Sequence, residues 1–164
     1  MIGRTQLSKV EEELEKHSEN LADEREIRRV VDEIDNRCDL KDWAGCRSCF
    51  ADEVEIDFTS LAGGEPSRVN ADDLIAGWRT NLFEAKKSFH TRTNHSIKID
   101  DDRAEVFSKG YAFNLIKEGE GAGFWEVWGH YTHRLEKTPS GWKCTGMKLD
   151  VIHQRGDEWV RTYS

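Results

Sequence analysis

The stretch FWEVWGHYTHRL, residues 124–135, alternates its side chains in a way that decides the fold class. Its odd positions are mostly apolar or aromatic, with His133 as the exception, whereas its even positions are mixed and polar. An alternation with a period of two is typical of a β-strand that buries one face. We therefore expect a strand over residues 122–136 whose odd-numbered side chains face a core.

Further strand-like runs surround this one. They lie near residues 89–99, 103–116 and 141–153. The stretch EWVRTY, residues 158–163, is expected to add a short edge strand. An earlier strand is indicated by EVEIDF, residues 53–58, where apolar residues alternate with acids. Turn-like sequences separate the later runs, so neighbouring strands should pair in the antiparallel sense.

Helical spacing dominates the first half of the chain. Residues 8–26 are polar and helix-favouring, and Asn70 can cap a helix that continues through Leu74, Ile75, Trp78 and Phe83. Between them, apolar residues recur at helical spacing: Ile27, Val30, Val31, Ile34 and Cys38. Helices followed by long meandering strands indicate an α+β fold, in which a strongly curved, antiparallel or mixed sheet carries its helices on one face.

Charge and length limit the classes of function. The 164 residues carry a formal net charge of −8, which disfavours nucleic acid as a partner because phosphate contacts need clustered Lys and Arg. We find no apolar run that approaches the roughly 20 residues of a membrane helix. The N-terminus lacks the apolar centre of a secretory signal. We therefore expect a cytoplasmic protein without a membrane partner.

The four cysteines are expected to be free thiols. Cys46 and Cys49 form a C-x-x-C pair, but the surrounding sequence is helical and no second pair follows. A structural zinc site needs four ligands, and a redox pair belongs at a strand-to-helix junction. We therefore expect no metal site.

Several segments carry a resemblance to a known family. They are CFADEVEIDF at residues 49–58, His90 with Asn94 and Ile97, and the later set Trp128, Tyr131, Leu135, Gly141, Trp142 and Lys143. In this order the chain resembles the SnoaL-like proteins of the nuclear transport factor 2-like superfamily. The resemblance implies a cone of curved sheet with the N-terminal helices on its concave side. It divides the chain into a charged N-terminal helix or extension, residues 1–23, and a cone domain, residues 24–164.

The resemblance also implies a catalytic Asp–His pair. By position the acid falls on Asp39 and the imidazole on His90, while Asp42 competes for the acid but stands where a helix cap is expected. A carboxylate bonded to one ring nitrogen stabilises the protonated imidazole, so that the pair can act as a general base. Dehydratases of the family have a second histidine on the following strand, where this chain reads GYA at residues 110–112.

His90 and His95 raise a question of side-chain direction. Five residues apart on a regular strand, they would point to opposite faces. His95 shares the parity of Ile97 and Ile99, which should face the core. A β-bulge near residues 91–94 would switch faces midway and let His90 enter the same interior.

The cavity beside this pair is expected to be lined by Trp125, Val127 and Tyr131, although these side chains would serve equally well as plain core. The hydroxyl of Tyr131 is a candidate donor to a substrate oxygen. Asn94 and His153 are further candidate substrate-binding residues. Together they would hold a small apolar, aromatic or terpenoid molecule.

These features predict a cofactor-independent lyase, of the dehydratase or dehydrohalogenase type, or an isomerase. The alternative is a non-catalytic module that binds a ligand or serves in assembly, such as the small subunit of an oxygenase. A third possibility is a proton shuttle on Asp57, which would have to point inward against the alternation of its strand. The exposed face of the sheet is apolar enough that we expect a homodimer.

Overall fold

The computed structural model describes residues 4–119 and 121–164, with side chains from residue 8 onward, so residues 1–3 of the expected N-terminal extension lie outside it. The helices are α1 (Arg4–Leu40), α2 (Trp43–Ser48), α3 (Thr59–Ala62), α4 (Ala71–Asn81) and α5 (Glu158–Thr162). The strands are β1 (Phe50–Asp57), β2 (Ser67–Asn70), β3 (Lys87–Asp100), β4 (Arg103–Ile116), β5 (Gly123–Thr138) and β6 (Gly141–Gly156).

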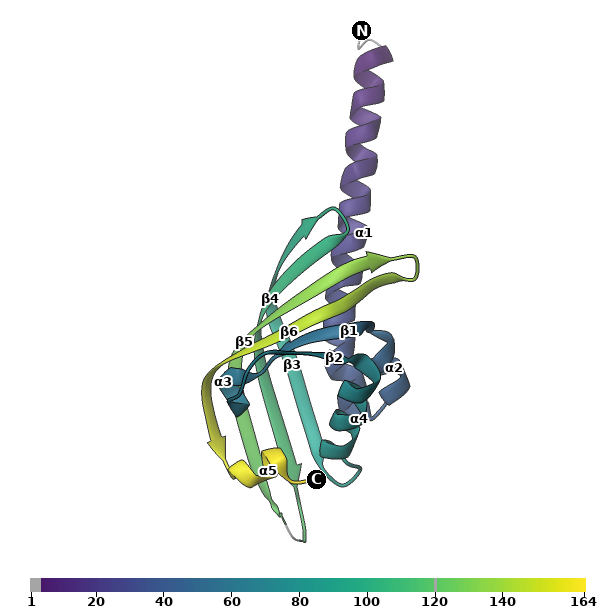
Figure 1. The fold of residues 1–164 in the computed structure, drawn as a ribbon. Helices are drawn as coiled ribbons and strands as arrows, with labels where there is room; N and C mark the ends of the chain where they lie inside the picture. The colour runs from purple at the N-terminus through teal and green to yellow at the C-terminus, as the bar shows by residue number, and fades with distance from the viewer. Residues whose placement is uncertain (1–3, 120) are drawn as a thin grey trace.

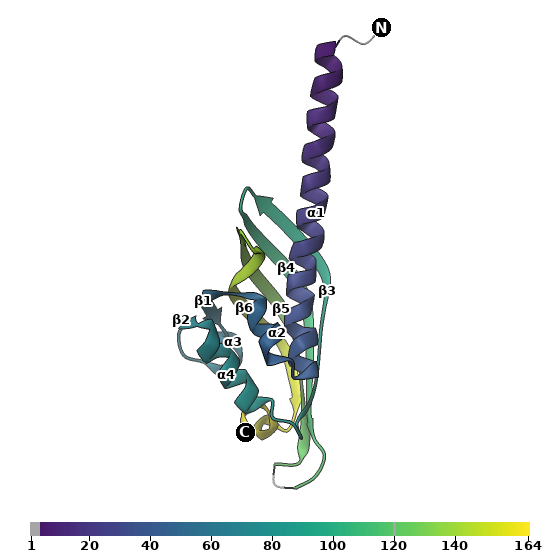
Figure 2. The same ribbon diagram turned by 90° about the vertical axis from the view of Figure 1, so that its right-hand side faces the viewer.

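The six strands form one mixed sheet in the order β2-β1-β6-β5-β4-β3. β1 runs parallel to β6, and the other neighbours are antiparallel. α1 lies along β3, and its N-terminal part extends past the end of the sheet (Figures 1 and 2). The expected α+β class is thus confirmed, whereas the strong curvature of the sheet stays a prediction.

α1 is a single helix that runs across the expected domain boundary at residue 23. The side chains of residues 8–22 are exposed. The stripe predicted from helical spacing is buried in the core: Ile27, Val30, Val31, Ile34 and Cys38. The C-terminal half of α1 is therefore held by tertiary packing, and the division into an extension and a domain stays a prediction.

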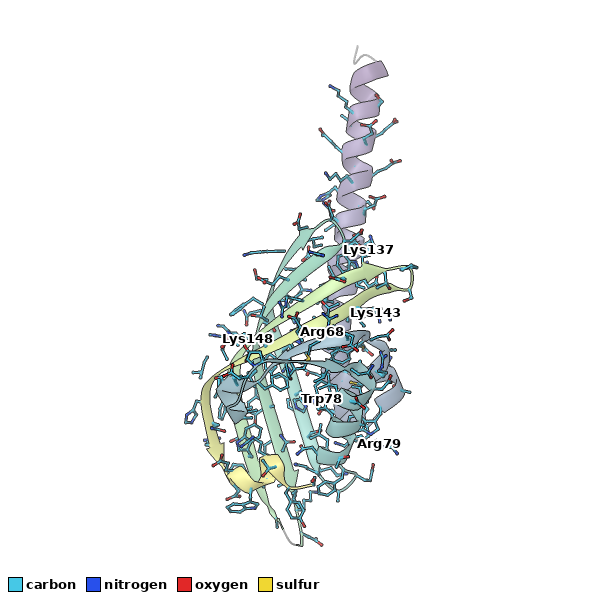
Figure 3. The ribbon with its side chains drawn as sticks, viewed as in Figure 1. Arg68, Trp78, Arg79, Lys137, Lys143 and Lys148 are labelled. Atoms are coloured by element: carbon cyan, nitrogen blue, oxygen red, sulfur yellow. The ribbon has the colours of Figure 1, made fainter. Side chains whose placement is uncertain are left out.

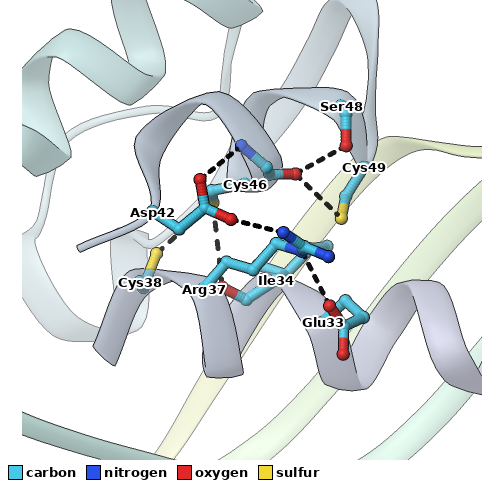
Figure 4. Close-up of polar contacts among 9 residues, drawn as sticks. Glu33, Ile34, Arg37, Cys38, Asp42, Cys46, Ser48 and Cys49 are labelled. Atoms are coloured by element: carbon cyan, nitrogen blue, oxygen red, sulfur yellow. Dashed lines mark hydrogen bonds and ion pairs between the residues drawn. The ribbon is translucent and has the colours of Figure 1, made fainter. Parts of the chain in front are cut away.

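α1 and α2 meet at a corner built from polar groups and thiols (Figure 4). Asp42 caps α2 by accepting a hydrogen bond of 3.0 Å from the Gly45 amide, and it also pairs with Arg37. The sulfurs of Cys38 and Cys46 lie 3.5 Å apart without a disulfide. These contacts confirm the prediction that Asp42 caps a helix. They also confirm that the cysteines are buried free thiols.

α4 packs on the sheet as its pattern predicts. Asn70 caps it by accepting a hydrogen bond of 2.9 Å from the Asp72 amide. Trp78 lies between α4 and the sheet (Figure 3), where its ring meets that of Phe50 edge to face at 5.7 Å. α4 thereby closes one side of the interior.

The prediction of an edge strand at residues 158–163 is wrong, because this segment contains the helix α5. Gly156, with φ +98°, ends β6 in a conformation that favours glycine. The helical turn then places Val160, which is fully buried, in a cluster with Ile116 and Trp125. α5 therefore covers one end of the core instead of extending the sheet.

Candidate active site

Asp39 and His90 form a hydrogen-bonded pair where α1 approaches β3. His90 Nδ1 lies 2.7 Å from Asp39 Oδ1, and the His90 backbone amide donates to Asp39 Oδ2 at 2.6 Å. Both side chains are largely buried, at 17% and 18% exposed. Two contacts to one carboxylate fix the imidazole and leave Nε2 as the nitrogen that can exchange a proton.

The electrostatics of Asp39 suit this role. Burial by itself works to raise the pKa of Asp39, but the hydrogen bonds and the charge of His90 outweigh it, so the pKa lies below its ordinary value. The carboxylate is therefore ionised at neutral pH and stabilises the imidazolium that forms when His90 takes up a proton.

An irregularity in β3 explains why both histidines face α1. The pairing of β3 with β4 shifts between Thr93 and Ser96, and Asn94 has a φ of +55°. Asn is one of the few residues other than Gly that readily adopts this left-handed conformation. The side chains on the inward face of β3 are even-numbered before this shift and odd-numbered after it. His90 and His95 therefore both lie against α1, as the predicted bulge required.

Two further acid–base pairs join α1 to β3, and sequence reasoning missed both. Arg92 Nη2 lies 3.0 Å from Asp35 Oδ1, with side chains only 2% and 8% exposed. His95 Nε2 lies 3.1 Å from Asp32 Oδ1, although the contact is not aligned as a hydrogen bond. Asp32, Asp35 and Asp39 follow three- and four-residue spacing on one helix face. Three aspartates at this spacing, next to the apolar stripe of the same helix, were the signal in the sequence that could have indicated these pairs.

A cavity of about 190 Å³ opens beside His90. Trp125, Val127 and Tyr131 line it, as predicted from the alternation in β5. Its polar lining residues are Asp35, Asn81, His90, Arg92, Asn114 and Arg161. An apolar cavity of about 150 Å³ holds a benzene ring, so this cavity has room for about one ring and a few further atoms.

A larger hollow, of about 710 Å³, lies on another part of the molecule. Its lining is mainly charged and includes Glu53, Arg68 and Lys98. We place the candidate site in the smaller cavity because that cavity combines apolar walls with the imidazole of His90.

Tyr131 and Arg92 occupy the space opposite Gly110. The guanidinium carbon of Arg92 lies 3.5 Å from the centre of the Tyr131 ring. A Cβ atom on Gly110 would lie only 2.6 Å from that ring. This packing leaves no room for a side chain at 110, one of the positions where dehydratases of the family are expected to have a second histidine. Burial also raises the pKa of the Tyr131 hydroxyl, which is therefore neutral.

The structure does not bring Asn94 and His153 to the cavity. Asn94 is exposed at the bulge, and its left-handed backbone accounts for its residue type. His153 is exposed and stacks on Trp128 at 5.6 Å between ring centres. Asp57, the candidate proton shuttle, is also not among the residues that line the cavity. Its carboxylate accepts hydrogen bonds from the amide and hydroxyl of Thr59, at 3.2 and 2.7 Å.

No group of three or more His, Cys, Asp and Glu side chains in residues 4–119 and 121–164 is placed to hold a metal ion. None of the described helices is long and apolar enough to span a membrane.

A long helix packed on a mixed six-stranded sheet is the arrangement of the nuclear transport factor 2-like, or cystatin-like, fold. The SnoaL-like domain family matches residues 19–148, and the chain belongs to that family. None of the curated protein sequences matches the chain.

Solved structures extend this comparison. The protein Kfla4162 of Kribbella flavida is 26% identical, with a TM-score of 0.80 over 87% of this chain and 99% of that one. A hexachlorocyclohexane dehydrochlorinase, LinA-type3 of Novosphingobium barchaimii, is 16% identical, with a TM-score of 0.68 over 84% and 92%. An NTF2-like protein of Novosphingobium aromaticivorans is 15% identical, with a TM-score of 0.67 over 93% and 92%. The last two show a shared fold alone.

Proposed function

We propose that this protein is a small-molecule enzyme in which Asp39 and His90 act together as a general base. The observation that carries the proposal is the 2.7 Å contact between His90 Nδ1 and the Asp39 carboxylate at the wall of an apolar cavity. The reaction class is a cofactor-independent elimination, as in a dehydratase or dehydrohalogenase, or an isomerisation.

The proposed step is proton removal from carbon. His90 Nε2 takes the proton from a carbon next to a leaving group or a carbonyl, and Asp39 stabilises the resulting imidazolium. The apolar walls exclude water and hold a small apolar, aromatic or terpenoid molecule against the ring. A positioned base of this kind contributes on the order of 10²–10⁴ in rate.

The test is a ligand screen followed by product analysis. Terpenoids of about one ring and aromatic ketones and acids of similar size are screened by thermal shift against the wild type. Compounds that bind are then incubated with the protein and analysed by mass spectrometry. His90→Gln and Asp39→Asn should keep binding but lose turnover by about 10²–10⁴-fold. His17→Gln, on the exposed part of α1, is the matched control and should behave as the wild type. Equal turnover in the wild type and His90→Gln would contradict the proposal, and binding without turnover in either would favour a ligand-binding module.

We further propose that the protein forms a homodimer through the outer face of the sheet. A row of aromatic rings crosses β3 to β6 there, with ring centres 5.2–6.4 Å apart: Phe89, Tyr111, Trp128 and His153. Phe89→Lys should convert a dimer into a monomer in light scattering, whereas Trp159→Lys, at an equally exposed ring on α5, should not. A monomeric wild type at micromolar concentration would contradict this.

A further inference from the structure

Lys41 follows the last residue of α1, at a position where helices commonly have glycine. Its amide donates to the Cys38 carbonyl at 3.1 Å, and the Asp42 amide donates to the Arg37 carbonyl at 2.9 Å. These two hydrogen bonds define a common helix-ending turn, in which the residue after the helix takes a left-handed backbone. Lys41 has a φ of +60°. Glycine adopts this conformation without strain and lysine does not, so the residue type at 41 needs another reason.

The side chain of Lys41 reaches toward the Asp39–His90 pair. Its Nζ donates a hydrogen bond to Ser88 Oγ at 3.2 Å, on the strand that also carries His90. Burial lowers the pKa of the half-buried Lys41 ammonium group, whereas the negative charge of Asp39 acts in the opposite direction. The ordinary pKa of lysine, about 10.4, lies far enough above neutrality that the group stays cationic. A positive charge is thus held one side chain away from the Asp39 carboxylate.

Ser88 joins this ammonium group to Asp39. A serine hydroxyl has one hydrogen to donate and lone pairs that accept. Ser88 Oγ accepts a hydrogen bond from Lys41 and donates one to the Asp39 carboxylate, where it helps to lower the pKa of Asp39. The carboxylate therefore accepts three hydrogen bonds, of which the other two come from the backbone amide and the ring of His90. Hydrogen bonds linked in this way polarise one another.

We propose that Lys41 and Ser88 are positioning residues of the general base, which fix the Asp39 carboxylate and offset part of its charge. This inference rests on the proposed function, because it concerns the base named there. A carboxylate alone favours the protonated imidazole, and a ring that already holds a proton cannot take one from a substrate. The ammonium group opposes a second positive charge nearby, so that Nε2 of His90 stays free. Neither Lys41 nor Ser88 is among the residues that line the cavity, so both act through Asp39.

Other titratable groups face this chain of hydrogen bonds. They include Asp35, Cys38, Glu84 and Lys87. Burial and the contact with Cys46 raise the pKa of Cys38, whose thiol is therefore neutral. Glu84 and Lys87 are exposed and opposite in charge, and Asp35 is paired with Arg92 at 3.0 Å. Removing the Lys41 ammonium group therefore changes the field at Asp39 while these other charges stay as they are.

The experiment follows the protonation of His90 by NMR in protein that carries isotope-labelled histidine. The His90 signals are assigned from their loss in His90→Gln. In Lys41→Met the midpoint of the His90 titration should rise by about 0.3–1 pH unit, because a nearby cation is removed. Ser88→Ala should also raise the midpoint, and the double variant should show less than the sum of the two shifts, because both changes act on one carboxylate. Lys87→Met, at an exposed lysine of the same strand, is the matched control and should shift the midpoint by no more than about 0.1 pH unit.

Stability separates this role from a role in folding. Lys41→Gly relieves the left-handed backbone, so it should melt at the same temperature as the wild type or higher, while it raises the His90 midpoint as Lys41→Met does. Asp101→Gly is the control for the backbone effect, because Asp101 has a φ of +51° in the exposed turn between β3 and β4. It should also keep or gain stability, but it should leave the titration of His90 unchanged.

The outcomes separate this inference from the proposed function. An unchanged or lowered His90 midpoint in Lys41→Met or in Ser88→Ala overturns the inference, as does a lower melting temperature of Lys41→Gly. If His90→Gln loses turnover of a compound from the ligand screen while the midpoint stays unchanged in both variants, the general base stands and the positioning role fails. If the midpoints rise as expected while His90→Gln keeps its turnover, the arrangement around Asp39 stands and the general base fails.

Discussion

The buried pair of Arg92 and Asp35 allows the sharpest prediction about stability. Arg92→Met leaves the Asp35 carboxyl buried without its partner, where it must remain charged or take up a proton. Removing one member of a buried pair costs about 3–5 kcal/mol. For a chain of this length each kcal/mol lowers the melting temperature by about 2–4 °C, so we expect a fall of about 6–20 °C. In the double variant Asp35→Leu, Arg92→Met no charge is left unpaired, and most of the loss should be recovered.

The assay is urea unfolding and thermal melting of the two single variants, the double variant and the wild type at pH 7. The exposed pair Arg28–Glu24, at 3.4 Å with side chains 43% and 47% exposed, provides the control. Arg28→Met should change the free energy of unfolding by no more than about 0.5 kcal/mol. If Arg92→Met is as stable as Arg28→Met, or if the losses of the single variants simply add in the double variant, the reasoning fails.

Three further predictions concern single positions. Folding lowers the pKa of Asp39, so its ionised carboxylate stabilises the wild type above about pH 3.9. Asp39→Asn should therefore be less stable than the wild type at pH 7, and this difference should disappear as the pH falls through the lowered pKa. Denaturant titrations of both proteins at pH 3 and pH 7 check this. Burial lowers the pKa of His133 to about 3, with Arg92 contributing. The free energy of unfolding should therefore fall by up to about 1.4 kcal/mol per pH unit as the pH drops from 6.5 toward 3. His133→Leu should remove this dependence, and an unchanged pH dependence in that variant would contradict the prediction. Gly110→Ala should cost about 1–3 kcal/mol of unfolding free energy, because its Cβ would displace the Tyr131 ring; a melting temperature equal to the wild type would show that the ring yields.

Local periodicity predicted most of the secondary structure. The odd positions of FWEVWGHYTHRL face inward, and the stripe from Ile27 to Cys38 faces the core, because strand and helix geometry repeat within a few residues. Two elements at the ends differ from the prediction, and α3 and β2 were not predicted at all. α1 begins at Arg4 and continues as one helix, and α5 replaces an edge strand because Val160 is buried under the end of the sheet. Short segments of this kind take their conformation from what they pack against.

The candidate site was predicted in part. The pair Asp39 and His90 followed from the resemblance, and their contact matches it. Asn94 and His153 were chosen by position alone, and the structure places both in solvent. For Asn94 the reason is a backbone requirement at the bulge, which explains its residue type without any contact to a ligand.

The sequence by itself determined which residues alternate and which repeat at helical spacing, and therefore the α+β class and the inward face of β5. Only the tertiary structure decided the pairing of Asp35 with Arg92, and the burial of Asn114 Oδ1 without a hydrogen-bond partner among the described residues. Periodicity is a property of neighbours in the chain, whereas a partner depends on strand register and on helices tens of residues away. A side chain on the inward face can thus be expected from the sequence, but whether it finds a partner there is settled only when the chain is folded.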